Sequence, residues 1–168
     1  MLGVGDVIGS FFEHHPTKRM DFDLFSEDSC FTDDSVLTVA VADWILHEGE
    51  LREYFYDYVE RYPGAGYGGT FRNWALCRDV EPYGSWGNGS AMRVSPIGYS
   101  ETTLAGTLRR AEQSAAVTHN HPDGILGACA VAGCVFIART GGSKSDVIDF
   151  VDSEIGYAVD TPIDQLRA

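Results

Sequence analysis

The sequence predicts an all-α fold, because two patterns recur along it and a third is absent. Apolar residues repeat at the three- and four-residue spacing of one helix face in several segments. Glycine-rich stretches separate these segments, as expected for turns between helices. No stretch alternates apolar and polar residues long enough to predict a strand. With 168 residues, 44% of them hydrophobic, the chain can bury a sizeable core, and we expect one domain over 1–168.

Five long helices follow from the patterns. Three segments have the single apolar face of an amphipathic helix, and Pro63-Gly64 ends the first of them. These segments are 50–62, 101–116 and 144–155. Two others, 35–46 and 124–138, are apolar nearly all round and predict central helices. Segment 124–138 is shorter than the roughly 20 residues that span a bilayer, so we interpret it as a buried helix.

Charge and cysteine content narrow the class of protein. A net charge of −13 argues against binding to nucleic-acid phosphates and against an anionic membrane surface, so we expect neither partner. The four cysteines form no CxxC pair, and Cys129 and Cys134 lie in an apolar run, which suits a reducing compartment. The first ten residues lack the basic region of a signal peptide. We therefore expect a cytoplasmic protein.

Thr32, Asp33 and Asp34 stand directly before the apolar segment 35–46 and allow two interpretations. Thr32 is a suitable N-cap, and two carboxylates in a first helical turn complement the helix dipole, worth about 0.3–1 kcal/mol each. For this stretch alone, capping is the simpler explanation. However, a hydroxyl and two carboxylates are also the hard oxygen ligands that Mg²⁺ prefers.

A second acidic pair and two loops are further candidates. Asp6 and Glu13 lie two helical turns apart, so both would face the same way, although a solvated stripe is the simpler role for an isolated pair. The turn 87–90, Gly-Asn-Gly-Ser, would present backbone N–H groups to a phosphate if it opens a helix.

The sequence "HNHPDG" at 119–124 matches the opening of a metallo-β-lactamase-type zinc site. That site needs a further histidine where Gly124 stands, and ligands later in the chain, yet the last of the five histidines is His121. The zinc interpretation therefore fails. A helix cap before Pro122 is the simpler role for at least one of the two histidines.

Five motifs, taken in order, resemble those of the ADP-ribosylglycohydrolase family, which is related to the dinitrogenase-reductase-activating glycohydrolases. They are "GDVIGSFFE", "FTDDSVLTVAVA", "YPGAGYGGTFRNW", "SWGNGSAMRVSPIG" and "THNHPDGILGA", and they extend over essentially the whole chain. The resemblance implies a compact orthogonal bundle of helices that binds two Mg²⁺ ions. It also implies cleavage of the glycosidic bond between ADP-ribose and a protein or small-molecule acceptor.

The resemblance assigns roles to individual residues. It implies that Glu13 is the catalytic carboxylate at the metal site, where it positions or deprotonates the attacking water. It also implies that Thr32, Asp33 and Asp34 are metal ligands, and that Asp6 supports them or the fold. It implies contacts with the ligand by Gly66, Gly68, Gly69, Ser85, Trp86, Gly87, Asn88, Gly89 and His119. The acceptor linkage stays open between arginine, serine, ester and nucleic-acid linkages.

The C-terminal part departs from the family pattern. Family members continue into an aspartate-containing motif that completes the metal pair, and Asp160-Thr161-Pro162 does not reproduce it. We expect a C-terminally truncated domain, or a second chain that completes it, or a module that binds ADP-ribose without turnover. We further expect an uncovered apolar face, self-association or weak Mg²⁺ binding, unless Asp160 or Asp164 replaces the missing ligands.

Overall fold

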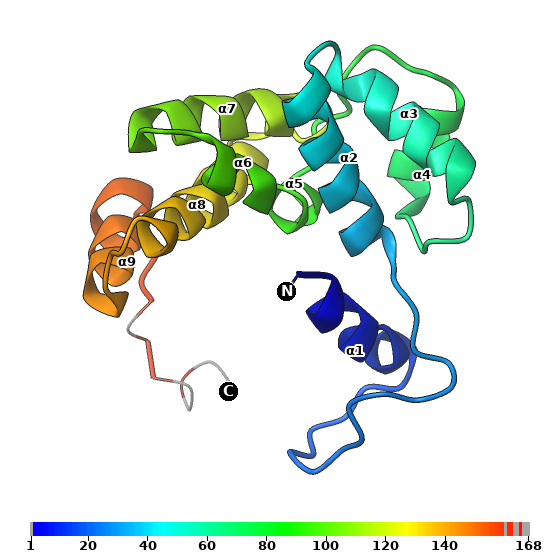
Figure 1. Cartoon of the computed structure of the whole chain (residues 1–168), viewed down its shortest axis with the longest axis horizontal. Coiled ribbons are helices and arrows are strands. Elements are labelled where there is room, and N and C mark those ends of the chain that lie inside the picture. Colours follow the sequence, from blue (N-terminus) through cyan, green and yellow to red (C-terminus); the bar gives the residue numbers. More distant parts are fainter. Residues whose placement is uncertain (1, 160, 163–164, 166–168) are drawn as a thin grey trace. The chain divides into compact units, whose positions relative to one another are not determined.

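A computed structural model describes residues 2–159, 161, 162 and 165. Its described residues form helices and turns and contain no strand, which confirms the all-α prediction (Figure 1). Contacts divide the chain into two compact units, Met1–Glu81 and Pro82–Ala168. Each unit carries part of the predicted site.

The first unit contains α1 (Leu2–His14), α2 (Asp33–His47), α3 (Leu51–Arg61) and α4 (Gly69–Leu76). Helix α2 packs against α1 and α3, and α3 packs against α4. The predicted helix 50–62 is therefore confirmed as α3, which ends before Pro63. The sequence patterns gave no helix at α4, because its apolar face rests on only a few residues in two turns.

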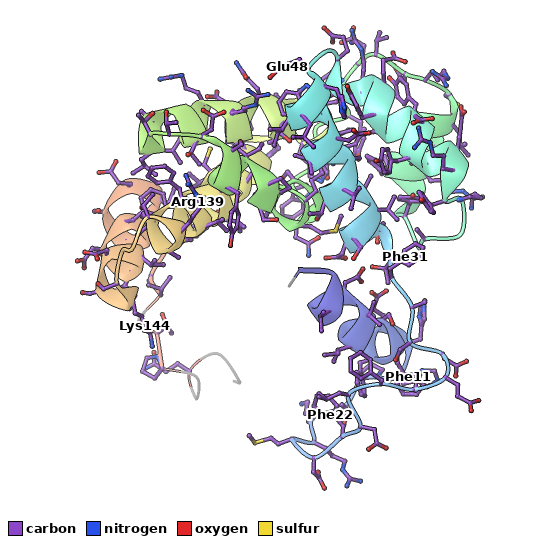
Figure 2. The ribbon with its side chains drawn as sticks, viewed as in Figure 1. Phe11, Phe22, Phe31, Glu48, Arg139 and Lys144 are labelled. Carbon is purple, nitrogen blue, oxygen red and sulfur yellow. The ribbon has the colours of Figure 1, made fainter. Side chains whose placement is uncertain are left out.

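Aromatic rings fill much of the core of the first unit. Phe55 of α3 meets Phe71 and Trp74 of α4 edge-on, and all three side chains are buried. Phe31 lies immediately before α2 (Figure 2). Its ring meets that of Tyr62 at the end of α3 edge-on, with ring centroids 5.8 Å apart. This last contact joins the segment before α2 to the end of α3.

Helix α2 is not covered on every side. Val36, Leu37 and Val41 are buried, whereas Val39 is 51% exposed and Leu46 is 76% exposed. Two exposed apolar residues do not by themselves make an apolar face, so the uncovered face and self-association both remain predictions.

The second unit is organised around α8 (Pro122–Arg139). The other elements are α5 (Gly89–Met92), α6 (Ser95–Ser100), α7 (Leu104–Ala116), α9 (Lys144–Phe150) and a π-helical turn η1 (Val151–Ile155). All of them contact α8. By length and composition alone α8 could also cross a membrane. Its contacts match the predicted role as a central helix, although only 28% of its residues are buried, fewer than the expected buried helix implies.

Small residues allow close packing on α8. A Cβ atom on Gly98 of α6 would lie 2.7 Å from the carbonyl oxygen of Ala132 and from Val135, so α6 can approach this closely only with glycine at that position. The predicted helix 144–155 is also present, although it divides into α9 and the π-helical turn η1.

Candidate functional site

Three carboxylates meet at the start of α2 in the first unit. Asp6 and Glu13 come from α1 and Asp34 comes from α2, and one oxygen from each lies within 4.8 Å of the others. We call these three residues the acidic cluster. The sequence predicted that Asp6 and Glu13 share one face of a helix, and α1 brings both to the first turn of α2.

Asp6 anchors the first turn of α2. Its carboxylate accepts hydrogen bonds from the Thr32 hydroxyl at 2.6 Å, the Thr32 N–H at 2.8 Å and the Ser35 N–H at 3.2 Å. Burial alone would raise the pKa of Asp6, but the hydrogen bonds from Ser35 and Thr32 hold it below its usual value. Asp6 therefore stays charged and holds α1 to α2.

Thr32 is both the cap of α2 and a neighbour of the acidic cluster. The side-chain oxygen of Thr32 accepts the N–H of Asp34 at 3.3 Å, so the predicted N-cap is confirmed. Only 7% of Thr32 is exposed, and its hydroxyl proton is directed to Asp6. Capping and proximity to the carboxylates therefore coexist in one residue.

The pKa of Asp33 is raised because this carboxyl is partly buried and lies near other acids. Burial and the neighbouring Asp34 raise the pKa of Asp33 to about 6, and Glu13 and Asp6 add to this. The pKa of Asp34 is also raised, by burial first and then by Asp6. A bound cation would relieve this repulsion, and the oxygen-only donor set is that of a hard ion such as Mg²⁺. The donor set therefore fits the metal that the resemblance implies.

The glycine loop 63–69 is joined to α2 in the first unit. The Asp33 N–H donates to the carbonyl oxygen of Ala65 at 2.7 Å. Gly66 has φ +90°, a conformation that favours glycine. A Cβ at Gly68 or Gly69 would meet nothing within 4 Å, so packing does not require glycine there, and the backbone is open to a ligand.

In the second unit, the predicted turn 87–90 opens a helix as expected, because α5 begins at Gly89. The Ser85 N–H donates to the carbonyl oxygen of Thr118 at 3.3 Å, and the Gly87 N–H donates to the Ser85 hydroxyl at 3.3 Å. Trp86 is 74% exposed, with its ring centroid 6.3 Å from that of His121. Asn88 precedes the first residue of α5 and makes no side-chain cap.

His119 lies against the same turn. A Cβ on Gly89 would be 3.0 Å from His119 Nε2, so the close approach of ring and backbone favours glycine at this position. His119 is 4% exposed, and burial, together with the charge of Arg93, lowers its pKa to about 4. The imidazole is therefore neutral at pH 7. His121 is the cap predicted before Pro122, since its ring accepts the N–H of Asp123.

The structure gathers the predicted residues unevenly. Asp6 was expected only to support the metal ligands or the fold. In the structure it lies in the acidic cluster itself, beside Glu13 and Asp34. Asp160 and Asp164, the suggested replacement ligands, lie outside the described residues.

Two residues beside the predicted site did not follow from the sequence. They are Arg93 and Thr118, which contact each other beside His119. An arginine inside the otherwise uncharged stretch 82–100 was the available signal.

Comparison with known proteins points to one family. The chain is 29% identical to ADP-ribosylhydrolase ARH3 of Homo sapiens over 192 aligned positions, covering 94% of this chain and 52% of the relative. It is 31% identical to ADP-ribosylhydrolase ARH3 of Bos taurus, over 79% of this chain and 41% of the relative. The chain thus spans about half the length of the curated relatives it matches. The ADP-ribosylglycohydrolase family model matches residues 2–167, and the chain therefore belongs to the ADP-ribosylglycohydrolase family.

Proposed function

We propose that the protein is a Mg²⁺-dependent hydrolase that cleaves the glycosidic bond between ADP-ribose and a protein or small-molecule acceptor. Family membership and the similarity to proteins named ADP-ribosylhydrolase support the reaction class. The observation that carries the proposal is the acidic cluster at the start of α2, where α1 brings Asp6 and Glu13 to Asp34.

The metal would be held by oxygens at the start of α2. Asp34, with Asp33 and the oxygen of Thr32, would be the ligands on this unit, and Asp6 would orient the Thr32 hydroxyl through their 2.6 Å hydrogen bond. Bound Mg²⁺ would supply Lewis-acid stabilisation of negative charge on oxygen. The raised pKa of Asp33 supports this assignment, because such a group gains most from a neighbouring cation.

Glu13 is our proposed proton acceptor. It is exposed on α1, so water and substrate can reach it, and it shares the acidic cluster with Asp34. Glu13 would take a proton from the water that attacks the anomeric carbon. The bond from that carbon to the acceptor breaks as the water attacks, through an oxocarbenium-like state, and the acceptor leaves with the bonding electron pair and takes up a proton from solvent.

The second unit would bind the ADP part of the ligand. The chain is acidic overall, with a net charge of −13 and few basic side chains to spare for an anion. We therefore expect neutral hydrogen-bond donors to hold the phosphates. The backbone N–H groups at the start of α5 and the neutral ring of His119 would supply such donors. The exposed indole of Trp86 offers a flat surface for the adenine base.

Release of free ADP-ribose tests this function. The purified chain is incubated with proteins carrying ADP-ribose on arginine, on serine or through an ester, in Mg²⁺ and in EDTA. We expect release from at least one linkage in Mg²⁺ and none in EDTA. Mg²⁺-dependent binding of ADP-ribose without any release would instead support a non-catalytic binding module. A chain that neither binds nor releases ADP-ribose would contradict both functions.

A further inference from the structure

A buried positive charge lies behind His119 in the second unit. The Arg93 side chain is fully buried, and its Nη2 donates to the carbonyl oxygen of Ser114 at 3.2 Å and to the Thr118 hydroxyl oxygen at 2.9 Å. Burial lowers the pKa of Arg93 to about 10, so the guanidinium remains charged at neutral pH. Thr118 therefore always has a cationic donor on one side.

The hydroxyl of Thr118 also contacts two rings. Its Oγ1 lies 2.7 Å from His119 Nδ1, and it is hydrogen-bonded to Tyr83. A threonine hydroxyl has one proton to donate and two lone pairs to accept with. Arg93 occupies one lone pair, because a guanidinium can only donate. One proton and one lone pair remain for the two rings.

The stronger acceptor of the two rings receives the proton. An imidazole nitrogen with a free lone pair accepts more strongly than a phenol oxygen, whereas a phenol O–H is a good donor. Tyr83 therefore donates to Thr118, and Thr118 donates to His119 Nδ1. The guanidinium reinforces this direction, since a hydroxyl that accepts from a cation becomes a better donor itself.

We propose that Arg93, acting through Thr118, holds His119 in the tautomer that carries its proton on Nε2 and presents this N–H at the Gly89 turn. Nε2 is the ring atom nearest to a Cβ built on Gly89, at 3.0 Å. Arg93 and Thr118 are then positioning residues. If the proposed function holds, the Nε2–H is a neutral donor for an oxygen of the ADP-ribosyl group.

Nitrogen NMR of the full chain without ligand tests the tautomer directly. His119 is assigned by comparison with His119→Gln, which removes its signals from those of the other four histidines. We expect Nδ1 to resonate as an unprotonated, hydrogen-bonded ring nitrogen and Nε2 as a protonated one. A protonated Nδ1, or averaged signals from both nitrogens, would overturn the proposal. This measurement needs no variant of Thr118 and no activity.

Two substitutions at Thr118 test the role of its hydroxyl. Thr118→Val removes the hydroxyl at nearly constant shape, so the two His119 nitrogen signals should move toward each other as the tautomers exchange. Thr118→Ser keeps the hydroxyl and should restore the wild-type pattern. Thr102→Val, the same change at an exposed position of this unit, is the matched control. An unchanged His119 spectrum in folded Thr118→Val would overturn the proposal.

ADP-ribose affinity, measured by calorimetry, separates this proposal from the proposed function. We expect Thr118→Val to bind ADP-ribose about tenfold more weakly than wild type, as for loss of one hydrogen bond to a charged group, and Thr118→Ser to bind within about threefold. Wild-type affinity in Thr118→Val would contradict the role of the Nε2–H as a ligand donor. A wild-type chain that binds no ADP-ribose would contradict the proposed function, while the nitrogen spectrum would still decide the tautomer.

Discussion

The carboxylate of Asp6 on α1 accepts a 2.6 Å hydrogen bond from the hydroxyl of Thr32, the residue that caps α2. The same carboxylate also accepts the N–H groups of Thr32 and Ser35. One side chain thus joins two helices and takes part in the acidic cluster. Stability and the candidate metal site are therefore linked through Asp6.

Replacement of Asp6 by asparagine should destabilise the protein. An amide has only one acceptor oxygen and no charge, so at least one of the three donors loses its partner. We expect Asp6→Asn to lower the free energy of unfolding by about 1–3 kcal/mol, measured by urea denaturation. Asp23→Asn, at an exposed carboxylate of the same unit, should change it by less than about 0.5 kcal/mol. Equal effects of the two substitutions would show that Asp6 is not an anchor.

The double substitution Asp33→Asn and Asp34→Asn should remove Mg²⁺ binding while the fold survives. The Thr32 cap remains, and loss of the helix-dipole interaction costs on the order of 1 kcal/mol. Burial first, and then repulsion from Asp34, raise the pKa of Asp33 to about 6, and removing this charge acts in the opposite direction, by a similar amount after allowance for solvent screening. In EDTA the melting temperature should therefore stay close to that of wild type.

Calorimetric titration with Mg²⁺ measures the other half of that prediction. The matched control is Asp152→Asn with Glu154→Gln, which makes the same change of charge at exposed positions of η1. The control should bind Mg²⁺ like wild type. If the Asp33/Asp34 variant also bound Mg²⁺ with wild-type affinity, the two carboxylates would serve the helix dipole alone.

Acid should destabilise the protein through His119. The pKa of this ring is about 4 in the folded state, against 6.5 for an ordinary histidine, so the unfolded chain binds more protons between these values. The contribution of His119 to stability is fully present above pH 6.5 and is lost as the pH falls to 4. The loss amounts to about 3 kcal/mol.

His119→Gln isolates this effect, because glutamine does not titrate. Urea denaturation of both proteins across pH 6.5 to 4 should give a wild-type stability that falls more steeply than that of the variant. The difference between the two curves is the relevant quantity, since Asp33 titrates with the opposite sign below its pKa of about 6. Parallel curves would show that the folded protein does not depress the pKa of His119.

The sequence predicted the long helices well, because their apolar periodicity extends over several turns. α3 and α7 match segments 50–62 and 101–116 with small shifts at the ends. The short helices α4 and α6 were missed, because they form where tertiary packing outweighs weak local signals. Close packing of α6 on α8 through Gly98 cannot be derived from a pattern of single residues.

The candidate site was only partly predictable for a similar reason. Thr32 as a cap and the shared face of Asp6 and Glu13 follow from local spacing. The three hydrogen bonds to Asp6 depend on how α1 meets α2, and the pairing of Arg93 with Thr118 joins residues far apart in the sequence. Such long-range contacts leave no periodic signal.

The most direct test of Mg²⁺-dependent hydrolysis with Glu13 as proton acceptor is the rate of ADP-ribose release by Glu13→Gln beside wild type, in Mg²⁺ and with the same ADP-ribosylated protein. Glutamine keeps the shape of the side chain but cannot take a proton. We expect the rate to fall by about 10²–10⁴-fold, the usual contribution of a general base, while ADP-ribose affinity stays within a few-fold of wild type. Release at the wild-type rate by Glu13→Gln, or no release by the wild-type chain, would contradict the account.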